Sequence, residues 1–251
     1  MSAASLTDAA LAAEVAAEAG RLLLAIREEG HQGRALGDEG DRRANALILE
    51  RLRAARPDDG FLSEESADDR KRLDFRRVWI IDPLDGTREY GEGRSDWAVH
   101  VALAIDGRPE VGAVALPALG LTLATDGAYA PIPAQSPPRM VVSRTRAPAE
   151  VTAIAGAIGA ELIPMGSAGA KAMAVVRGEA DIYFHAGGQY EWDNCAPAAV
   201  ALAAGLHASR ADGSPLVYNN ADTRVPDLLF CRPELADHLL ALIAAAGTAP
   251  A

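Results

Sequence analysis

Residues 79–93 read WIIDPLDGTREYGEG, in which a run of apolar residues ends directly at two acidic residues, Asp82 and Asp85. A continuous apolar run of this length is typical of a buried strand. Pro83 interrupts strand pairing because it has no backbone N–H, and the Gly-Thr pair that follows Asp85 can open a helix whose free N–H groups face an anion. The stretch predicts a strand that delivers two carboxylates to a site, although Pro and Asp-Gly are also common in ordinary turns.

The composition is that of a folded protein with an acidic surplus. Of the 251 residues, 49% are hydrophobic and 24% are charged, which suits one large domain or two smaller ones. Twenty-four basic residues stand against 35 acidic ones, a formal charge of −11. This charge repels polyanions, so we expect no nucleic-acid and no membrane partner, and a phosphorylated ligand would need a local cation.

The first 20 residues, MSAASLTDAALAAEVAAEAG, are rich in alanine but contain Asp8, Glu14 and Glu18. They lack the basic start and apolar run of a signal peptide, and the chain has no run of about 18 apolar residues that could span a membrane. Cys195 and Cys231 form no CxxC pair and are too few for a disulfide framework. We therefore expect a cytoplasmic protein.

Hydrophobic periodicity predicts an α+β first half. We expect helices over residues 6–29 and 41–56, strands over 60–63 and 78–82, and an antiparallel meander of strands 97–104, 110–116 and 121–125. Residues 129–140, YAPIPAQSPPRM, contain four prolines and are the expected junction between two subdomains.

Beyond the junction, strands and helices alternate, which favours an α/β second half. The expected strands are 140–143, 161–164 and 180–184, and the expected helices are 148–158, 168–177 and 194–204. We therefore divide the chain into an α+β subdomain, 1–135, and an α/β subdomain, 136–251. The first would hold most of the acidic site residues, and the second would hold Asp193 and the substrate contacts.

Two further acidic groups lie at the predicted ends of elements. Glu64 and Glu65 end the short strand in LSEES, and Asp193 begins a helix in EWDNCAPA. A solvated Glu pair and a helix-capping Asp are the alternatives. Carboxylates that meet at element ends are suitable ligands for hard cations such as Mg²⁺. The spacing in DPLDG does not match an EF-hand loop, and it has one residue too many for an aspartyl-phosphate phosphatase motif.

Taken in order, LSEES, WIIDPLDGT and EWDNCAPA resemble the inositol monophosphatase superfamily of lithium-sensitive, metal-dependent phosphomonoesterases, and the resemblance covers nearly the whole chain. It implies a layered αβαβα sandwich of the inositol monophosphatase and fructose-1,6-bisphosphatase type. It also implies two or three Mg²⁺ ions, held by Glu64, Asp82, the backbone carbonyl of Leu84, Asp85 and Asp193.

The same resemblance assigns Asp41 and Thr87 as the catalytic pair that orients the attacking water. Asp41 lies 23 residues before Glu64, the spacing that the resemblance implies. Family members usually carry a Lys, a Ser-Pro and a Val-Thr in a loop before this Asp, whereas this chain reads ALGDEGDRRAN at 35–45. We therefore expect a rewritten loop here, with Asp38 as the alternative to Asp41.

Within the superfamily, DPLDGTREY and GSAGAKAMAVVRGEADIY (166–183) resemble the 3′(2′),5′-bisphosphate nucleotidase branch, the CysQ type. This branch implies hydrolysis of the 3′-phosphate of adenosine 3′,5′-bisphosphate to AMP and phosphate by water that the metal activates, in sulfur assimilation or nucleotide recycling. The 5′-phosphosulfate form is a second candidate substrate. The candidate phosphate and substrate contacts are Gly86, Thr87, Arg88, Ser143, Arg144, Ser167 and Lys171.

Ser167 and Lys171 lie one helical turn apart, so both can face one ligand. The alternative for Lys171 is an exposed helix lysine. His100 suggests core packing rather than a ligand, and His185 is ambiguous.

Other functions remain open at this point. Inositol monophosphatase or fructose-1,6-bisphosphatase activity would use the same metal core, and a catalytically silent, metal-bound phosphometabolite sensor is an alternative outside enzymes. A homodimer is implied by the resemblance only.

Overall fold

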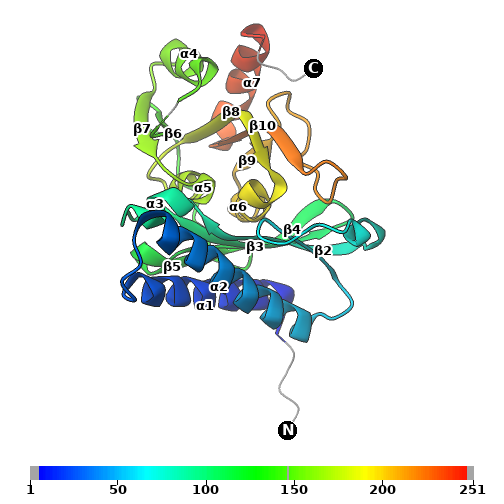
Figure 1. Cartoon of the computed structure of the whole chain (residues 1–251). Helices are drawn as coiled ribbons and strands as arrows, with labels where there is room; N and C mark the ends of the chain where they lie inside the picture. Colours follow the sequence, from blue (N-terminus) through cyan, green and yellow to red (C-terminus); the bar gives the residue numbers. More distant parts are fainter. Residues whose placement is uncertain (1–5, 146, 248–251) are drawn as a thin grey trace.

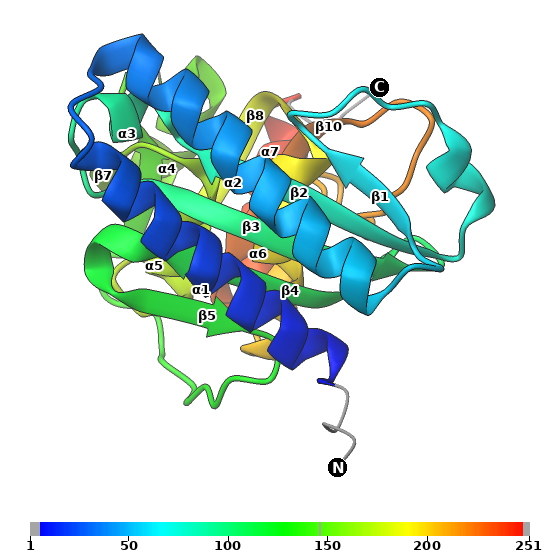
Figure 2. The same cartoon turned by 60° about the horizontal axis from the view of Figure 1, so that its bottom comes forward.

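The computed structural model describes residues 6–145 and 147–247, which form five layers of alternating helices and sheets (Figure 1). Two long antiparallel helices, α1 (Asp8–Arg27) and α2 (Gly33–Ala55), form the first layer, and they lie across one face of the first sheet (Figure 2). Helices α5 (Ala168–Val176) and α6 (Glu191–Ala203) separate this sheet from the second. Helices α4 (Ala149–Ala157) and α7 (Ala236–Ala245) cover the far side. The predicted αβαβα sandwich is confirmed.

The first sheet has the strand order β1-β2-β3-β4-β5. Strands β2 to β5 are antiparallel neighbours, as the meander predicted, and β1 runs parallel to β2. Their bounds are β1 Gly60–Ser63, β2 Arg77–Asp85, β3 Ala98–Ile105, β4 Arg108–Leu116 and β5 Leu121–Ala124. The short helix α3 (Thr87–Gly91) follows β2 directly.

The second sheet is mixed and has the order β7-β6-β8-β10-β9. Its strands are β6 Arg139–Ser143, β7 Glu161–Met165, β8 Ile182–Tyr190, β9 His207–Ser209 and β10 Arg224–Cys231. Three short 3₁₀ segments complete the described elements: Lys71–Asp74, Pro117–Leu119 and Pro233–Leu235.

The central strands supply two cores because successive side chains point to opposite faces. On β2, Trp79 and Ile81 pack against α1 and α2, whereas Val78 and Ile80 pack between the sheets. This inter-sheet core also contains residues of the second half, such as Phe230. A strand that is buried on both faces explains why residues 78–81 are apolar without alternation.

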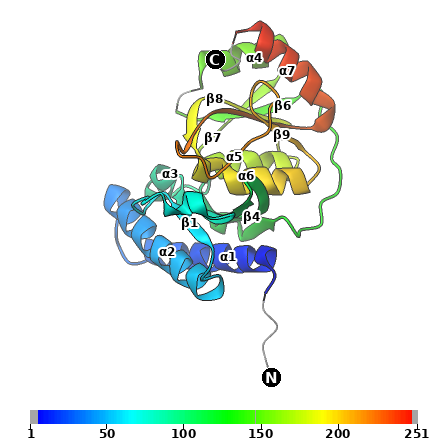
Figure 3. The same cartoon turned by 90° about the vertical axis from the view of Figure 1, so that its right-hand side faces the viewer.

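The proline-rich segment connects β5 of the first sheet to β6 of the second along the side of the molecule (Figure 3). It therefore lies where the sequence predicted a junction, and the division at residue 135 stays a prediction. Cys195 and Cys231 are buried and free, as expected. Within the described part of the chain, no helix is both long and apolar enough to cross a membrane.

The segment before Asp41 is helical. Residues 35–40, expected to be a loop, lie inside α2, which begins at Gly33 rather than at Asp41. The loop was expected from the resemblance, whereas Gly37 and Gly40 are helical for a packing reason. A Cβ at position 37 would lie 2.6 Å from Thr87 Cγ2, and one at position 40 would lie 3.1 Å from the Tyr90 ring. The glycines let α2 approach the segment that carries the DPLDGT motif.

Candidate metal and active site

Three carboxylates converge between the two sheets. Asp82 and Asp85 of β2 and Asp193 of α6 each offer an oxygen within 4.8 Å of the other two. Asp82 and Asp85 are buried, and Asp193 is half-buried. The structure thus brings together three acids that the sequence placed at the ends of separate elements.

A β-bulge explains how two acids three residues apart reach the same face. Asp82 pairs with His100 and Asp85 pairs with Ala98, so Pro83 and Leu84 together lie opposite the single residue between those partners. The extra residue reverses the alternation of side chains. Leu84 consequently points into the helix-side core, and Asp85 joins Asp82 between the sheets. A proline is tolerated here because a bulge requires no ladder hydrogen bond from it.

On one side of the cluster, carboxylates face one another. Burial and the neighbouring Glu64 and Asp85 raise the pKa of Asp82 well above its usual value. Burial and Asp193 likewise raise the pKa of Glu64 to about 7. The pKa of Asp193 rises to about 6 through burial and Asp85, even though its carboxylate also accepts the Tyr190 N–H as a helix cap.

These shifts arise because several carboxylates are buried close to one another. Oxygen donors crowded in this way fit a hard divalent ion, which prefers carboxylate ligands and neutralises their repulsion. Asp82, Asp85 and Asp193 could therefore hold a metal, and Glu64 lies beside Asp82. The Leu84 carbonyl, also predicted as a ligand, accepts a hydrogen bond from the Thr87 hydroxyl at 3.0 Å.

Asp85 differs from its neighbours because it is surrounded by donors. It accepts hydrogen bonds from the Ser167 hydroxyl and from the N–H groups of Ala168 and Gly169 at the start of α5. Its Oδ2 also lies 3.2 Å from His100 Nε2. Burial alone would raise the pKa of Asp85, but His100, Ser167 and the Gly169 N–H lower it to about 2. The start of α5 thus holds Asp85 as a fixed anion.

His100 is fully buried on β3 and reaches two parts of the site. Its Nδ1 lies 3.0 Å from the Trp192 carbonyl, which can only accept, so Nδ1 carries a proton. Burial lowers the pKa of His100, but Asp85 and the Trp192 carbonyl together raise it by more, so the pKa lies above its usual value. A Cβ at Gly169 would lie 2.0 Å from His100 Nε2. Only glycine at that position allows His100 and α5 to meet at Asp85.

The predicted catalytic pair is also assembled. The Thr87 hydroxyl lies 3.3 Å from Asp41 Oδ2. Asp41 Oδ1 is buried and has no hydrogen-bond partner among the described residues. Burial, with Glu65 and Glu64 nearby, raises the pKa of Asp41 to about 8. The alternative, Asp38, is exposed and pairs with Arg34, so the geometry favours Asp41.

Ser167 and Lys171 lie at the cluster, but both are occupied. Ser167 binds Asp85, as described above. Lys171 is only 6% exposed, which excludes the surface-lysine alternative. Its Nζ donates to the carbonyls of Gly166 and Ser167. Burial lowers the pKa of Lys171, while Asp85 and Glu89 oppose the shift.

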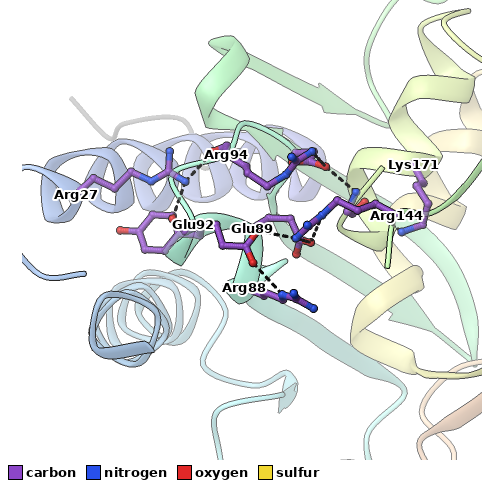
Figure 4. A network of polar contacts seen from close by, with 10 residues as sticks. Arg27, Arg88, Glu89, Glu92, Arg94, Arg144 and Lys171 are labelled. Carbon is purple, nitrogen blue, oxygen red and sulfur yellow. Dashed lines mark hydrogen bonds and ion pairs between the residues drawn. The ribbon is translucent and has the colours of Figure 1, made fainter. Parts of the chain in front are cut away.

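Arg88 and Arg144 take part in a network of ion pairs beside the cluster (Figure 4). Arg144 binds Glu89 and Glu92 of the α3 region, each at 2.7 Å, and Arg88 also binds Glu92. Ser143 lies at the end of β6, one residue before Arg144. Gly86 takes φ +87 at the start of α3, a backbone conformation that favours glycine.

Three residues of the site were missed by the sequence analysis as functional groups: His100, Glu89 and Asp96. Glu89 packs against Gly166, where a Cβ would lie 2.3 Å from Glu89 Cγ. Asp96 accepts the Gly166 N–H at 2.6 Å and pairs with Arg94. Both therefore support the turn that starts α5. No sequence motif distinguishes such supports from ordinary surface acids.

The chain matches the model of the inositol monophosphatase family over residues 2–247. A protein of Mycobacterium leprae (strain TN), named 3′-phosphoadenosine 5′-phosphate phosphatase, is 55% identical over an alignment of 256 positions, covering 96% of this chain and 94% of that protein. The 3′(2′),5′-bisphosphate nucleotidase CysQ of Escherichia coli (strain K12) is 31% identical over 187 residues, 70% of this chain and 76% of that protein.

Among solved structures, CysQ from Bacteroides thetaiotaomicron superimposes with a TM-score of 0.77 at 25% identity and covers 90% of this chain and 97% of that one. Inositol monophosphatase II of Staphylococcus aureus MSSA476 has a TM-score of 0.75 at 19% identity, covering 93% of this chain and 97% of that one, and shows the shared fold.

Proposed function

Since the chain belongs to the inositol monophosphatase family, we propose that it is a Mg²⁺-dependent phosphatase that removes the 3′-phosphate of adenosine 3′,5′-bisphosphate. The products would be AMP and inorganic phosphate. The observation that carries the proposal is the convergence of Asp82, Asp85 and Asp193 next to the Asp41–Thr87 pair. The substrate is supported by the names of the relatives, above all the one that is 55% identical.

Mg²⁺ would be held by Glu64, Asp82, the Leu84 carbonyl, Asp85 and Asp193. When bound, Mg²⁺ would lower the pKa of a water molecule. It would also neutralise negative charge on the phosphoryl group and on the leaving oxygen. The cluster suits such an ion because Glu64 and Asp82 have raised pKa values in its absence. The number of bound ions, two or three as the resemblance implies, stays a prediction.

Thr87 and Asp41 would orient the attacking water. The Thr87 hydroxyl has a single proton, and the Leu84 carbonyl and Asp41 are its two acceptors. The oxygen of the threonine can then accept a hydrogen bond from water. Asp41 Oδ1, buried and without a partner among the described residues, is available to accept a proton. A general base works best when its pKa lies near the working pH, and burial raises the pKa of Asp41 above that of an exposed aspartate.

Phosphate release by the purified protein tests the proposal. Adenosine 3′,5′-bisphosphate, inositol 1-phosphate and fructose 1,6-bisphosphate are offered side by side with Mg²⁺, together with a chelator control. We expect a preference for the nucleotide and no release when the metal is chelated. An Asp85→Asn variant should be inactive, and full activity in that variant would refute the site.

The alternatives give different outcomes in the same assay. Preference for inositol 1-phosphate or fructose 1,6-bisphosphate would keep the metal site and reject the substrate. Nucleotide binding without phosphate release would favour the sensor. The phosphosulfate form as a second substrate, a homodimer and a cytoplasmic location are further predictions that this assay leaves aside.

A further inference from the structure

A cavity of about 610 Å³ lies between the start of β4, the last turns of α6 and the strand β9. Its volume is in the range of small-molecule binding sites. Ala199, Leu202 and Leu216 give it apolar walls, and Leu202 is 47% exposed. An occupant of the cavity would remove this apolar surface from water.

The cavity is distinct from the acid cluster. Helix α6 begins at the cluster with Asp193 and reaches the cavity with Leu202, nine residues later. At about 1.5 Å per residue, these two positions lie about 14 Å apart along the helix. None of the described lining residues belongs to the acid cluster or to the Asp41–Thr87 pair. A ligand in this cavity would therefore occupy a site of its own.

A β-bulge turns two charged side chains toward the cavity. Val111 and Pro109 of β4 pair with consecutive residues of β3, so Glu110 between them is an extra residue. A bulge of this kind redirects the side chains around it. Arg108 and Glu110 both line the cavity as a result.

Arg108 and Glu110 are exposed, and neither side chain forms an ion pair or a hydrogen bond with any described residue. By contrast, the exposed Arg76 pairs with Asp106 at 2.8 Å. A cation and an anion that both lack partners among the described residues thus lie two residues apart at the edge of the cavity.

Thr125 adds an unsatisfied hydroxyl group deeper in the cavity. Its N–H donates to the Gly112 carbonyl at 3.0 Å. Gly112 is buried against α6, since a Cβ there would lie 2.8 Å from the Cβ of Ala199, whereas Glu110 is exposed. Thr125 Oγ1 is buried and has no hydrogen-bond partner among the described residues. A buried hydroxyl without a partner costs free energy, which a ligand with a matching polar group would recover.

From these observations we infer that the cavity binds a free α-amino acid with a large aromatic side chain, for which tryptophan is the best match. The carboxylate binds Arg108, and the ammonium group binds Glu110. The ring covers the apolar wall at Leu202, and the indole N–H donates to Thr125 Oγ1. This inference goes beyond the proposed function and does not depend on it.

Other ligand chemistries fit less well. A simple anion would be repelled by Glu110, and a simple cation would be repelled by Arg108. The two ends of a peptide carry one charge each, whereas a free amino acid carries both charges on one carbon atom. His207 also lines the cavity, but burial lowers its pKa, so it adds no charge near pH 7.

Isothermal titration calorimetry of the full chain with L-tryptophan tests the inference. N-acetyl-L-tryptophan lacks the ammonium group, L-tryptophan amide lacks the carboxylate, and L-alanine lacks the ring. We expect L-tryptophan to bind with a dissociation constant of about 1 mM or lower, which is typical of a ligand of this size. The other three compounds should each bind at least about tenfold more weakly, because each loses one set of contacts.

Variants of the lining residues assign the contacts. Arg108→Gln and Glu110→Gln should each raise the dissociation constant for L-tryptophan about tenfold, and Thr125→Val should raise it about fivefold. Arg21→Gln and Glu50→Gln are matched controls, because they remove exposed charges of α1 and α2 on the other face of the first sheet (Figure 2). Both controls should bind L-tryptophan as the wild type does. Phosphate release should stay within about twofold of the wild type in all of these variants, since the cavity and the acid cluster are separate.

No detectable binding of L-tryptophan, or equal binding of its N-acetyl and amide forms, would overturn the inference. An unchanged dissociation constant in both Arg108→Gln and Glu110→Gln would do the same. Saturating adenosine 3′,5′-bisphosphate should change the affinity for L-tryptophan by no more than about twofold. Full displacement would place the amino acid at the acid cluster and refute a separate site. A wild type that binds L-tryptophan but releases no phosphate would refute the proposed function and leave this inference standing.

Discussion

The two flanks of the acid cluster are built in opposite ways. On the first flank, Asp41, Glu64 and Asp82 face other carboxylates, and their pKa values are raised. On the second flank, Asp85 is surrounded by His100 and the start of α5, and its pKa is lowered to about 2. The charge of Asp85 is thus compensated by protein groups. The charges of the neighbouring acids, a few ångströms away, are not compensated in this way.

This difference indicates what each flank contributes. The compensated carboxylate is fixed in place before any ligand arrives, because its partners are backbone N–H groups and a buried imidazole. The uncompensated carboxylates store repulsion that a divalent cation would relieve. A site with one preorganised carboxylate and several carboxylates that repel one another should bind metal tightly. The protein should therefore be less stable without metal than with it.

The strongest test compares Asp82→Asn with Asp85→Asn. Each should lower turnover by at least about 10³-fold, because metal ligation contributes several kcal/mol to the barrier. Their effects on the metal-free protein should be opposite. Asp82→Asn removes an acid whose pKa is raised by folding and should raise the thermal midpoint.

Asp85→Asn leaves His100 without its counter-charge and should lower the midpoint, since breaking a buried ion pair costs about 3–5 kcal/mol. Thermal unfolding in chelator measures both changes. Shifts of the same sign would show that the two flanks do not differ as their contacts imply.

Thr87→Val should lower kcat about 10²-fold, the usual loss for a group that assists proton transfer, with the Mg²⁺ dependence unchanged. Thr87→Ser should keep most activity. The serine variant also tests how closely α2 packs here. Gly37→Ala should destabilise the wild type, because its Cβ would meet Thr87 Cγ2 at 2.6 Å.

In the Thr87→Ser background that methyl group is absent, so the alanine should be tolerated. Additive effects of the two substitutions on the thermal midpoint would contradict the close contact between α2 and the motif.

On the compensated flank, His100→Gln should raise the Mg²⁺ concentration needed for half-maximal activity about 10–100-fold, a common cost of losing a partner of a metal ligand. At saturating Mg²⁺, kcat should recover. His207→Gln is a matched control, because His207 bonds to Ser209 on the edge strand β9. Unchanged Mg²⁺ dependence would mean that α5 alone orients Asp85.

Much of the site could be predicted because strand ends and acids coincide in the sequence. Apolar runs placed β1 and β2, and their acidic ends predicted Glu64, Asp82 and Asp85. The bulge that brings Asp82 and Asp85 to one face was less visible. Its signal was a proline inside a strand, which indicated only where pairing stops.

The parts that were missed depend on partners far away in the chain. The resemblance implied a loop before Asp41, and local propensity disfavours glycine in a helix. Gly37 and Gly40 are nevertheless helical, because contacts with Thr87 and Tyr90 require small residues there. His100 looked like a packing residue because its partners, Asp85 and Trp192, are brought to it only by the fold.

The uncompensated flank should make the metal-free protein less stable as pH rises. The pKa values of Asp41, about 8, and Glu64, about 7, exceed those of the unfolded chain, about 4. The folded protein therefore keeps protons that the unfolded chain releases. This stability is complete below about pH 4 and is lost as the pH rises through 7 to 8. His100, whose pKa is also raised, acts in the same direction.

We expect the thermal midpoint in chelator to fall by several degrees between pH 5 and pH 8, at about 2–4 °C per kcal/mol for a chain of this size. Saturating Mg²⁺ should flatten this dependence, because the ion replaces the protons. Equal slopes with and without Mg²⁺ would show that the repulsion is relieved in another way.

The smallest effect is expected at the outer support of the compensated flank, where Arg144 binds Glu89 and Glu89 packs against Gly166 before α5. The Arg144 side chain is 21% exposed and its second partner, Glu92, is 40% exposed, so solvent screens these pairs and they contribute little to stability. Arg144→Ala should therefore lower the thermal midpoint by only a few degrees, and Arg76→Ala, which removes an exposed pair with Asp106, should do less.

The kinetic effect of Arg144→Ala decides whether this arginine also serves the substrate. The weak pair with Glu92 can exchange for a phosphate oxygen, because guanidinium binds both anions in the same geometry. We expect the KM for adenosine 3′,5′-bisphosphate to rise about fivefold in Arg144→Ala and to stay unchanged in Arg76→Ala. If KM is unchanged while stability falls, Arg144 supports α5 through Glu89 and does not contact the phosphate.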